Sequence, residues 1–264
     1  MALSLKQFSR PENREKIITI VGEGGVGKTS LAALFPDPVI IRIEDGVTTD
    51  MENVVCSPVI KTSGEIFECI AALKTENHQR KTVIFDSITQ ANLIFEKEIV
   101  AGDPKNPASI NQAQGGYGNG HGAVSALHQA LREHAGDLSL SRNMHVIFIA
   151  HAEGMTIDPA DSDPFLQYTL RLNKRSISPY VDNVDAVAFI KLARTLKSSS
   201  KENGPKKALG DGSRIISCYS SPAQVSKNRF RIKADLPFIE GTNPFAPFLE
   251  IPSETPKTTE EQST

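Results

Sequence analysis

The sequence has few cysteines and no long apolar run, and both absences exclude classes of protein. Three cysteines lie scattered among 264 residues and form no CxxC pair, which argues against a disulfide framework or a cysteine zinc site. No apolar run approaches the ~20 residues of a membrane helix. The N-terminal segment MALSLKQFSRPENREK lacks the apolar centre of a secretory signal. We therefore expect a protein of the reducing cytoplasm that binds no membrane.

The chain also lacks a strong excess of charge of either sign. The formal net charge is −2 at pH 7, so a globally basic nucleic-acid-binding protein is not indicated, although a local basic groove is still compatible. The hydrophobic content of 39% is ordinary for a globular chain that can bury a core. We expect a lead-in over residues 1–16, one domain over residues 17–251 and a disordered acidic tail over residues 252–264.

Short β-branched runs alternate with segments of helical periodicity along this domain. Strands are expected over residues 17–21, 39–44, 82–86, 145–150, 185–193 and 214–220. Helices are expected over residues 30–35, 63–76 with Ser63 as its cap, 87–100 and 123–135. Long loops are expected over residues 102–122 and 152–176, and a flexible hairpin tip over residues 197–213. The pattern predicts an α/β fold, in which helices flank a mostly parallel central sheet with an antiparallel extension near the C-terminus.

The segment GEGGVGKTS directly follows the first apolar strand and matches the GxxxxGK[ST] pattern of a P-loop. Its residues are Gly22, Glu23, Gly24, Gly25, Val26, Gly27, Lys28, Thr29 and Ser30. Glycines let backbone N–H groups curl around phosphate oxygens, and the following helix N-terminus adds partial positive charge. In such a loop the lysine reaches the β- and γ-phosphates, and the Thr29 hydroxyl binds Mg²⁺. The expected ligands are therefore ATP and Mg²⁺.

A second metal ligand is expected at the end of the third strand. TVIFD ends in Asp86 after an apolar run, which is the form of a Walker B motif. A carboxylate at the carboxyl end of a parallel strand lies on the same side of the sheet as the P-loop. The alternative is that Asp86 only caps the helix that follows it.

Hydrolysis requires a group that orients and deprotonates water, and the residue after Asp86 is Ser87 rather than glutamate. We expect Glu44, at the end of VIIRIE, to be this base if its strand adjoins the Asp86 strand. His151 ends the fourth strand and is a candidate contact for the γ-phosphate. The alternatives are that Glu44 or Asp45 is a loop carboxylate without a role, and that His151 is an exposed histidine.

Four segments resemble RecA-type recombinases and RadA. VIFDSITQA resembles the Walker B strand of RecA-type recombinases, IIRIEDGVTTD their catalytic-glutamate strand, and VIFIAHAEG the RadA strand that ends in Gly-His. SKNRFR resembles the KNRFG motif of RadA, with Arg231 in place of glycine. The order of the segments is similar to that of small phage-encoded RecA/RadA-like P-loop ATPases of the single-strand annealing and recombinase group. The zinc motif of RadA and the N-terminal oligomerisation domain of RecA have no counterpart here.

The resemblance implies a RecA-like P-loop NTPase fold with ATP between subunits. A cation of the neighbouring subunit then completes each site, and Lys227 and Arg229 are the candidates. The alternative is a basic strand end on a solvated surface.

The resemblance also implies contact with single-stranded DNA through the two long loops. The candidate residues are Tyr117, Tyr168, Arg171, Lys174 and Arg175, because cations that follow a backbone and aromatic rings that stack on bases suit single-strand binding. The alternative is that both loops are polar surface.

These features together predict an ATP-hydrolysing protein that acts on single-stranded DNA in phage recombination, annealing or replication, in the host cytoplasm. Expected partners are single-stranded DNA, further copies of the chain and a phage single-strand-binding protein. Two alternatives remain. One is an ATP-dependent switch or helicase loader that acts on a protein. The other is a small-molecule kinase, which usually needs an arginine-rich lid, whereas the KSSSKENGPKK tip carries no arginine.

Overall fold

The computed structural model describes residues 14–46, 54–161, 163–193, 195–197, 207–209, 212–219 and 221–249. Its strands are β1 (Ile17–Gly22), β2 (Pro38–Arg42), β3 (Val55–Cys56), β4 (Thr82–Asp86), β5 (His145–Ile157), β6 (Phe165–Leu170), β7 (Ala186–Leu192), β8 (Thr195–Lys197), β9 (Lys207–Leu209), β10 (Arg214–Ser217), β11 (Lys227–Asn228) and β12 (Leu236–Phe238). Its helices are α1 (Lys28–Ala32), α2 (Ser63–Thr75), α3 (Ile88–Ala101), η2 (Ala113–Gly115), α4 (Asn119–Ser141), η3 (Lys174–Ser176), α5 (Ser178–Val181) and α6 (Ala246–Leu249). No helix of these described ranges is long and apolar enough to span a membrane.

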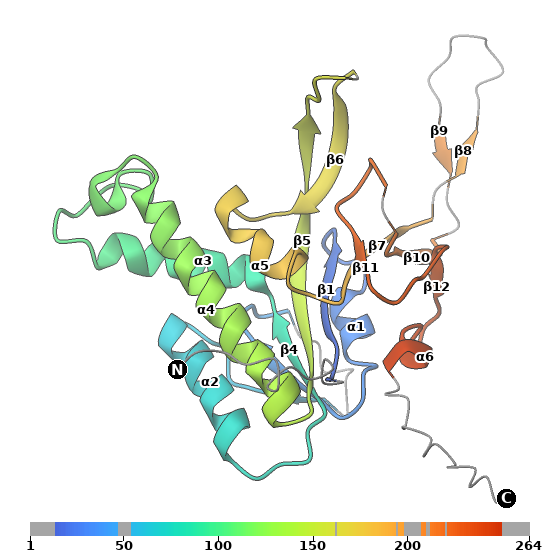
Figure 1. Ribbon diagram of the computed structural model, residues 1–264, viewed down its shortest axis with the longest axis horizontal. Coiled ribbons are helices and arrows are strands. Elements are labelled where there is room, and N and C mark those ends of the chain that lie inside the picture. Colours follow the sequence, from blue (N-terminus) through green and yellow to red (C-terminus); the bar gives the residue numbers. More distant parts are fainter. Residues whose placement is uncertain are drawn as a thin grey trace, which may run out of the picture.

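One large sheet organises the molecule, with the strand order β12-β10-β7-β1-β5-β4-β2-β3 (Figure 1). The strands from β7 to β3 run parallel, whereas β10 and β11 pair antiparallel with β7, and β12 pairs antiparallel with β10. The predicted fold class is confirmed: a mostly parallel central sheet is flanked by helices and extended by antiparallel strands on its C-terminal side.

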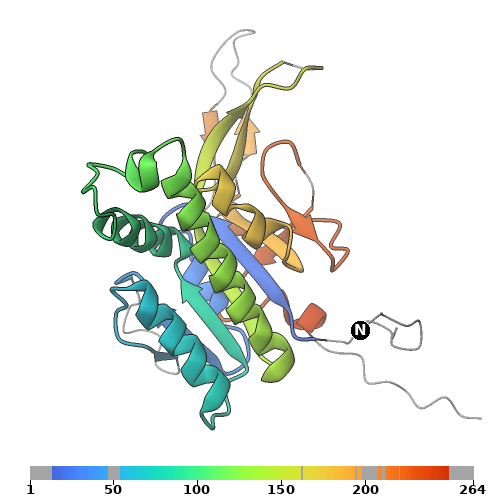
Figure 2. The same ribbon diagram turned by 60° about the vertical axis from the view of Figure 1, so that its left-hand side comes forward.

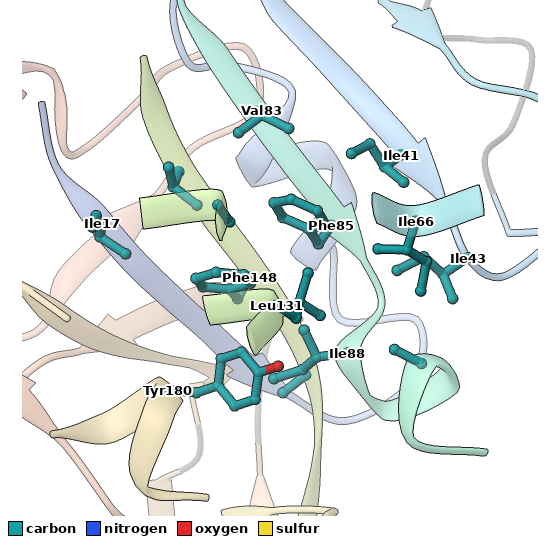
Figure 3. Packing of buried hydrophobic residues seen from close by; sticks show 14 of the residues in the cluster. Ile17, Ile41, Ile43, Ile66, Val83, Phe85, Ile88, Leu131, Phe148 and Tyr180 are labelled. Atoms are coloured by element: carbon teal, nitrogen blue, oxygen red, sulfur yellow. The ribbon is translucent and has the colours of Figure 1, made fainter. Parts of the chain in front are cut away.

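Helices cover both faces of the sheet (Figures 1 and 2), and each face has its own apolar core. Helices α2, α3 and α4 pack on one face, where Phe85 and Phe148 stack at 5.2 Å and Tyr180 lies edge-on to Phe148 (Figure 3). Helices α1 and α6 pack on the other face. Each such fully buried side chain contributes about 1.5–3 kcal/mol by leaving water. Two filled cores hold the central strands rigidly, and this fixes the positions of the loops at their carboxyl ends.

Several predicted boundaries were wrong. Helix α2 is capped by Thr62 rather than Ser63, because the Thr62 side chain and Glu65 form a reciprocal capping box. Helix α4 begins at Asn119, inside the glycine-rich stretch that was predicted as a loop. Strand β2 ends at Arg42, so Glu44 lies two residues beyond the strand.

The largest correction concerns the segment after the fourth strand, which was predicted to be a long polar loop over residues 152–176. Strand β5 instead continues past His151 to Ile157 and pairs antiparallel with β6, from Ala152 opposite Leu170 to Ile157 opposite Phe165. The β5–β6 hairpin extends beyond the rest of the sheet (Figure 1). His151 therefore lies at the base of a hairpin and does not end its strand.

Three other expectations fall wholly or partly outside the described residues. They are the lead-in up to residue 13, the acidic tail over residues 252–264 and most of the hairpin tip over residues 197–213. Strands β8 and β9, which border that tip, pair antiparallel.

Candidate nucleotide-binding site

The P-loop connects the end of β1 to the start of α1. Gly25 and Gly27 have φ values of +72° and +95°, which only glycine adopts readily, so the loop can turn sharply twice. A Cβ atom built on Gly24 or Gly25 meets no atom of the described chain within 4 Å, so no other described segment packs against this part of the loop. This cradle at a helix start suits a chain of phosphates.

Lys28 lies across the cradle rather than out in solvent. The residue is only 7% exposed, and its Nζ donates a hydrogen bond of 2.8 Å to the Glu23 carbonyl oxygen. Burial lowers the pKa of Lys28, while the nearby carboxylates of Asp86 and Glu44 raise it and Arg171 lowers it further. A bound phosphate would stabilise the charged form of Lys28, because its negative charge offsets the desolvation of the buried ammonium.

Thr29 and Asp86 converge at the mouth of this cradle. Strand β5 separates β1 from β4, and the parallel register brings the carboxyl ends of all three strands to one edge. There the Thr29 hydroxyl donates to Asp86 Oδ2 at 2.7 Å. Asp86 is 3% exposed, and burial is the main cause that raises the pKa of its carboxyl group. A hydroxyl and a carboxylate in contact at the start of α1 are the oxygen ligands that Mg²⁺ prefers beside a nucleotide.

The capping alternative for Asp86 does not hold, because Ser87 is the N-cap of α3. Its backbone is extended, and its hydroxyl accepts a hydrogen bond from the Gln90 N–H at 3.2 Å. The Asp86 carboxylate therefore does not cap α3, and it accepts its hydrogen bond from Thr29 next to the P-loop.

Glu44 stands on the opposite side of Asp86 from the P-loop strand. Strand β2 pairs directly with β4, as the sequence hypothesis required, and the Glu44 N–H donates to the Asp86 carbonyl oxygen at 2.9 Å. Glu44 Oε2 accepts from the Ser87 hydroxyl at 2.7 Å and lies 3.4 Å from His151 Nε2. The hydrogen bond with His151 is the main cause that lowers the pKa of Glu44 and keeps it a carboxylate. Asp45, its neighbour, instead pairs with Arg42 at the surface.

The Glu44 side chain opens into a cavity of about 390 Å³. Carboxylates of Glu44, Glu96 and Glu153 line it, and Arg171 is the cation of its lining. The space is large enough for ordered water next to the carboxylate of Glu44.

The basic motif SKNRFR lies at the other end of the sheet. Strand β11 pairs with the first residues of β7, so that Lys227 is opposite Val187, whereas the P-loop follows the last residues of β1. Arg229 forms an ion pair of 3.1 Å with Asp185, and Lys227 Nζ donates to the Asp182 carbonyl oxygen. The structure does not bring these two cations to the P-loop of their own chain.

The residues predicted to contact DNA are divided between two places. Arg175 Nη1 donates to the Gly118 carbonyl oxygen at 2.6 Å and so joins the two long segments next to Tyr117, which is fully exposed. Tyr168 lies on β6 and packs against Phe189. Arg171 lies at the base of the hairpin, where its N–H donates to the His151 carbonyl oxygen at 2.8 Å.

Two residues at the P-loop were not found from the sequence. Arg214 and Phe238 pair across β10 and β12, and the Arg214 guanidinium lies 4.4 Å over the Phe238 ring. A Cβ atom on Gly27 would come within 2.5 Å of Arg214 Nη1, so this stack borders the start of α1. No motif surrounds either residue, and only the sheet topology brings them there.

The comparison with protein families agrees with this geometry. No match was found among curated proteins. Residues 14–230 match the model of a family described as AAA domain, AAA_24, and this region contains the P-loop, Asp86, Glu44 and His151. The chain therefore belongs to this AAA domain family of P-loop ATPases.

Proposed function

We propose that the protein hydrolyses ATP with Mg²⁺ at the carboxyl edge of its sheet and uses the cycle to act on single-stranded DNA. The observation that carries the hydrolytic part is the convergence of Lys28, Thr29 with Asp86, and Glu44 from three separate strand ends onto one cradle. A role in stability alone would not explain why a P-loop, the Thr29–Asp86 pair and the Glu44 carboxylate lie together.

Each residue then has a role in one displacement reaction. The P-loop amides and Lys28 would hold the β- and γ-phosphates, and Thr29 and Asp86 would hold Mg²⁺, which would neutralise charge on the phosphate oxygens. Glu44 accepts a proton from a water molecule in the adjoining cavity while the water oxygen attacks the γ-phosphorus. The bond from the γ-phosphorus to the bridging oxygen breaks, and ADP and phosphate leave.

His151 connects this chemistry to the β5–β6 hairpin. Its ring lies 3.4 Å from Glu44, and the hairpin begins at the next residue, where Ala152 pairs with Leu170. A ligand that moves the hairpin would therefore move a contact of the base. We propose that this ligand is single-stranded DNA, which the exposed ring of Tyr117 and the cations Lys174 and Arg175 would contact.

We also propose that copies of the chain assemble head to tail, so that Lys227 and Arg229 reach the nucleotide of a neighbour. The support is their place at the end of the sheet opposite the P-loop, where they cannot serve their own site. In that assembly their charge would stabilise the transferred phosphoryl group. The resemblance to phage-encoded RecA/RadA-like proteins supports a role in recombination, annealing or replication, with a single-strand-binding protein as a further partner.

The test is a phosphate-release assay of the full chain with ATP and Mg²⁺, with and without single-stranded DNA. We expect turnover that rises with single-stranded DNA and much less with duplex DNA of the same length. Turnover that ignores DNA and responds to a protein partner would favour the switch or loader instead. Transfer of phosphate to a small acceptor rather than to water would favour the kinase.

A further inference from the structure

Arg171 was predicted from the sequence as a DNA contact, and it lies at the base of the β5–β6 hairpin beside Glu44. It directly follows β6, and its N–H is bonded to the carbonyl oxygen of His151 on the partner strand. Its side chain lines the same 390 Å³ cavity as Glu44. The neighbouring Arg175, by contrast, is bonded to Gly118.

The Arg171 guanidinium is exposed and makes no hydrogen bond or ion pair with any residue that the structure describes. Its positive charge is also one of the causes that lower the pKa of Lys28. The chain thus has one cation at the P-loop and one at the cavity that Glu44 lines, and the Glu44 N–H donates to the carbonyl oxygen of Asp86 beside the P-loop. Such a pair is stabilised by an anion between them.

We propose that Arg171 contacts the γ-phosphate of the ATP bound in its own chain. This inference rests on the proposed hydrolytic function of the site. Lys28 would approach the phosphates from the P-loop. Arg171 would approach them from the cavity that Glu44 lines. Its planar guanidinium can bind two phosphate oxygens at once, which an ammonium cannot do.

The position also makes Arg171 a link between hairpin and nucleotide. Arg171 and His151 flank the pairing of Ala152 with Leu170 at the first rung of the hairpin. Loss of the γ-phosphate would release Arg171, and the base of the hairpin would lose one of its ties to the nucleotide. ADP should therefore bind without this contact.

The test compares the full chain with Arg171→Ala, Arg171→Lys and the charge-removal control Lys74→Ala. Lys74 lies on α2, and its side chain forms an exposed ion pair with Asp137, so the loss of this charge should change little. Affinities are measured for a non-hydrolysable ATP analogue and for ADP, and turnover is measured without DNA. For Arg171→Ala we expect about tenfold weaker binding of the analogue, unchanged ADP affinity and turnover lowered on the order of 10³-fold. Arg171→Lys should recover part of the analogue affinity and less of the turnover.

Three outcomes would overturn the proposal. The first is unchanged affinity of Arg171→Ala for the analogue, for ADP and for single-stranded DNA. The second is an equal loss for both nucleotides, which would indicate a damaged pocket. The third is weaker binding of single-stranded DNA with no change toward nucleotides, which would return Arg171 to the DNA surface. A wild-type chain that binds nucleotide without turnover would refute the proposed hydrolysis, while the affinity ratio would still decide the role of Arg171.

Discussion

The two ends of the central sheet differ in whether their cationic side chains form ion pairs. At the end where β1 and β7 begin, Asp185 accepts hydrogen bonds from the Ile17 N–H and from Arg229 and lies 3.7 Å from Arg14. At the carboxyl end, Lys28 is bonded only to a carbonyl oxygen of its own loop, and Arg171 is unpaired among the described residues. Charges at the first end satisfy one another, whereas the cations Lys28 and Arg171 at the second end have no ion-pair partner among the described residues and can bind an anionic ligand.

The comparison suggests what each end does. Paired charges around Asp185 hold the starts of two strands together, and a ligand there would have to compete with the existing ion pairs. Burial of the Lys28 ammonium has a desolvation cost in the free protein, and a phosphate chain with Mg²⁺ would offset it. Substitutions at the carboxyl end should therefore change nucleotide binding and turnover far more than substitutions at the other end.

Lys28→Ala should give the largest effect on binding. We expect ATP affinity to fall more than about 100-fold, since the buried ammonium is the main charge that the P-loop presents to the β- and γ-phosphates. The fold should persist, because Lys28 belongs to neither apolar core. Titration with a fluorescent ATP analogue measures the affinity, and circular dichroism checks the fold. Unchanged affinity would refute the assignment of the cradle.

Arg229→Ala tests the end of the sheet where β1 and β7 begin, and its effect should be smaller than that of Lys28→Ala. ATP binding should stay near normal, while turnover falls by about 10–100-fold, because the missing charge acts mainly in the transition state of a neighbour. Mixing Arg229→Ala with Glu44→Gln should then restore partial turnover, since a mixed interface can combine an intact base with an intact cation. Turnover is measured at a concentration where light scattering detects oligomers. Activity no higher than the sum of the separate variants would contradict a shared site.

His128, on α4, should give the smallest effect, which is a loss of stability at acidic pH. His128 is fully buried, lies 2.8 Å from the Tyr180 hydroxyl and 3.2 Å from Asn92 Oδ1, and burial lowers its pKa to about 3. The unfolded histidine has a pKa near 6.5. Below that pH the unfolded chain binds a proton that the folded chain does not, so stability falls as pH decreases from 6.5 toward 3.

The slope from His128 is at most about 1.4 kcal/mol per pH unit. Urea unfolding at pH 7 and pH 5 measures it, and His128→Gln should show a smaller loss of stability between these two values than the wild type. Equal losses in both proteins would show that His128 does not stay neutral in the fold.

The sequence predicted most where the signal is local. The P-loop is one continuous motif. The pairing of β2 with β4, which brings Glu44 to Asp86, was only a condition of the Glu44 hypothesis, and the structure meets it. The β5–β6 hairpin was missed because AEGMTI is short, polar and interrupted by Gly154, so its alternation gave no clear strand signal. Arg171 could not be placed because its position depends on this missed hairpin. Arg214 could not be placed because the pairing of β10 with β7 brings it to Gly27, which is far away in the chain.

Turnover by Glu44→Gln tests the central claim most directly, because it separates hydrolysis from binding within one site. Asp45→Asn is the matched control, since it removes the adjacent carboxylate, which pairs with Arg42 at the surface. We expect Glu44→Gln to bind ATP with near-native affinity and to lose turnover by about 10²–10⁴-fold, while Asp45→Asn keeps both. Native turnover in Glu44→Gln, or equal losses in the two variants, would contradict the account.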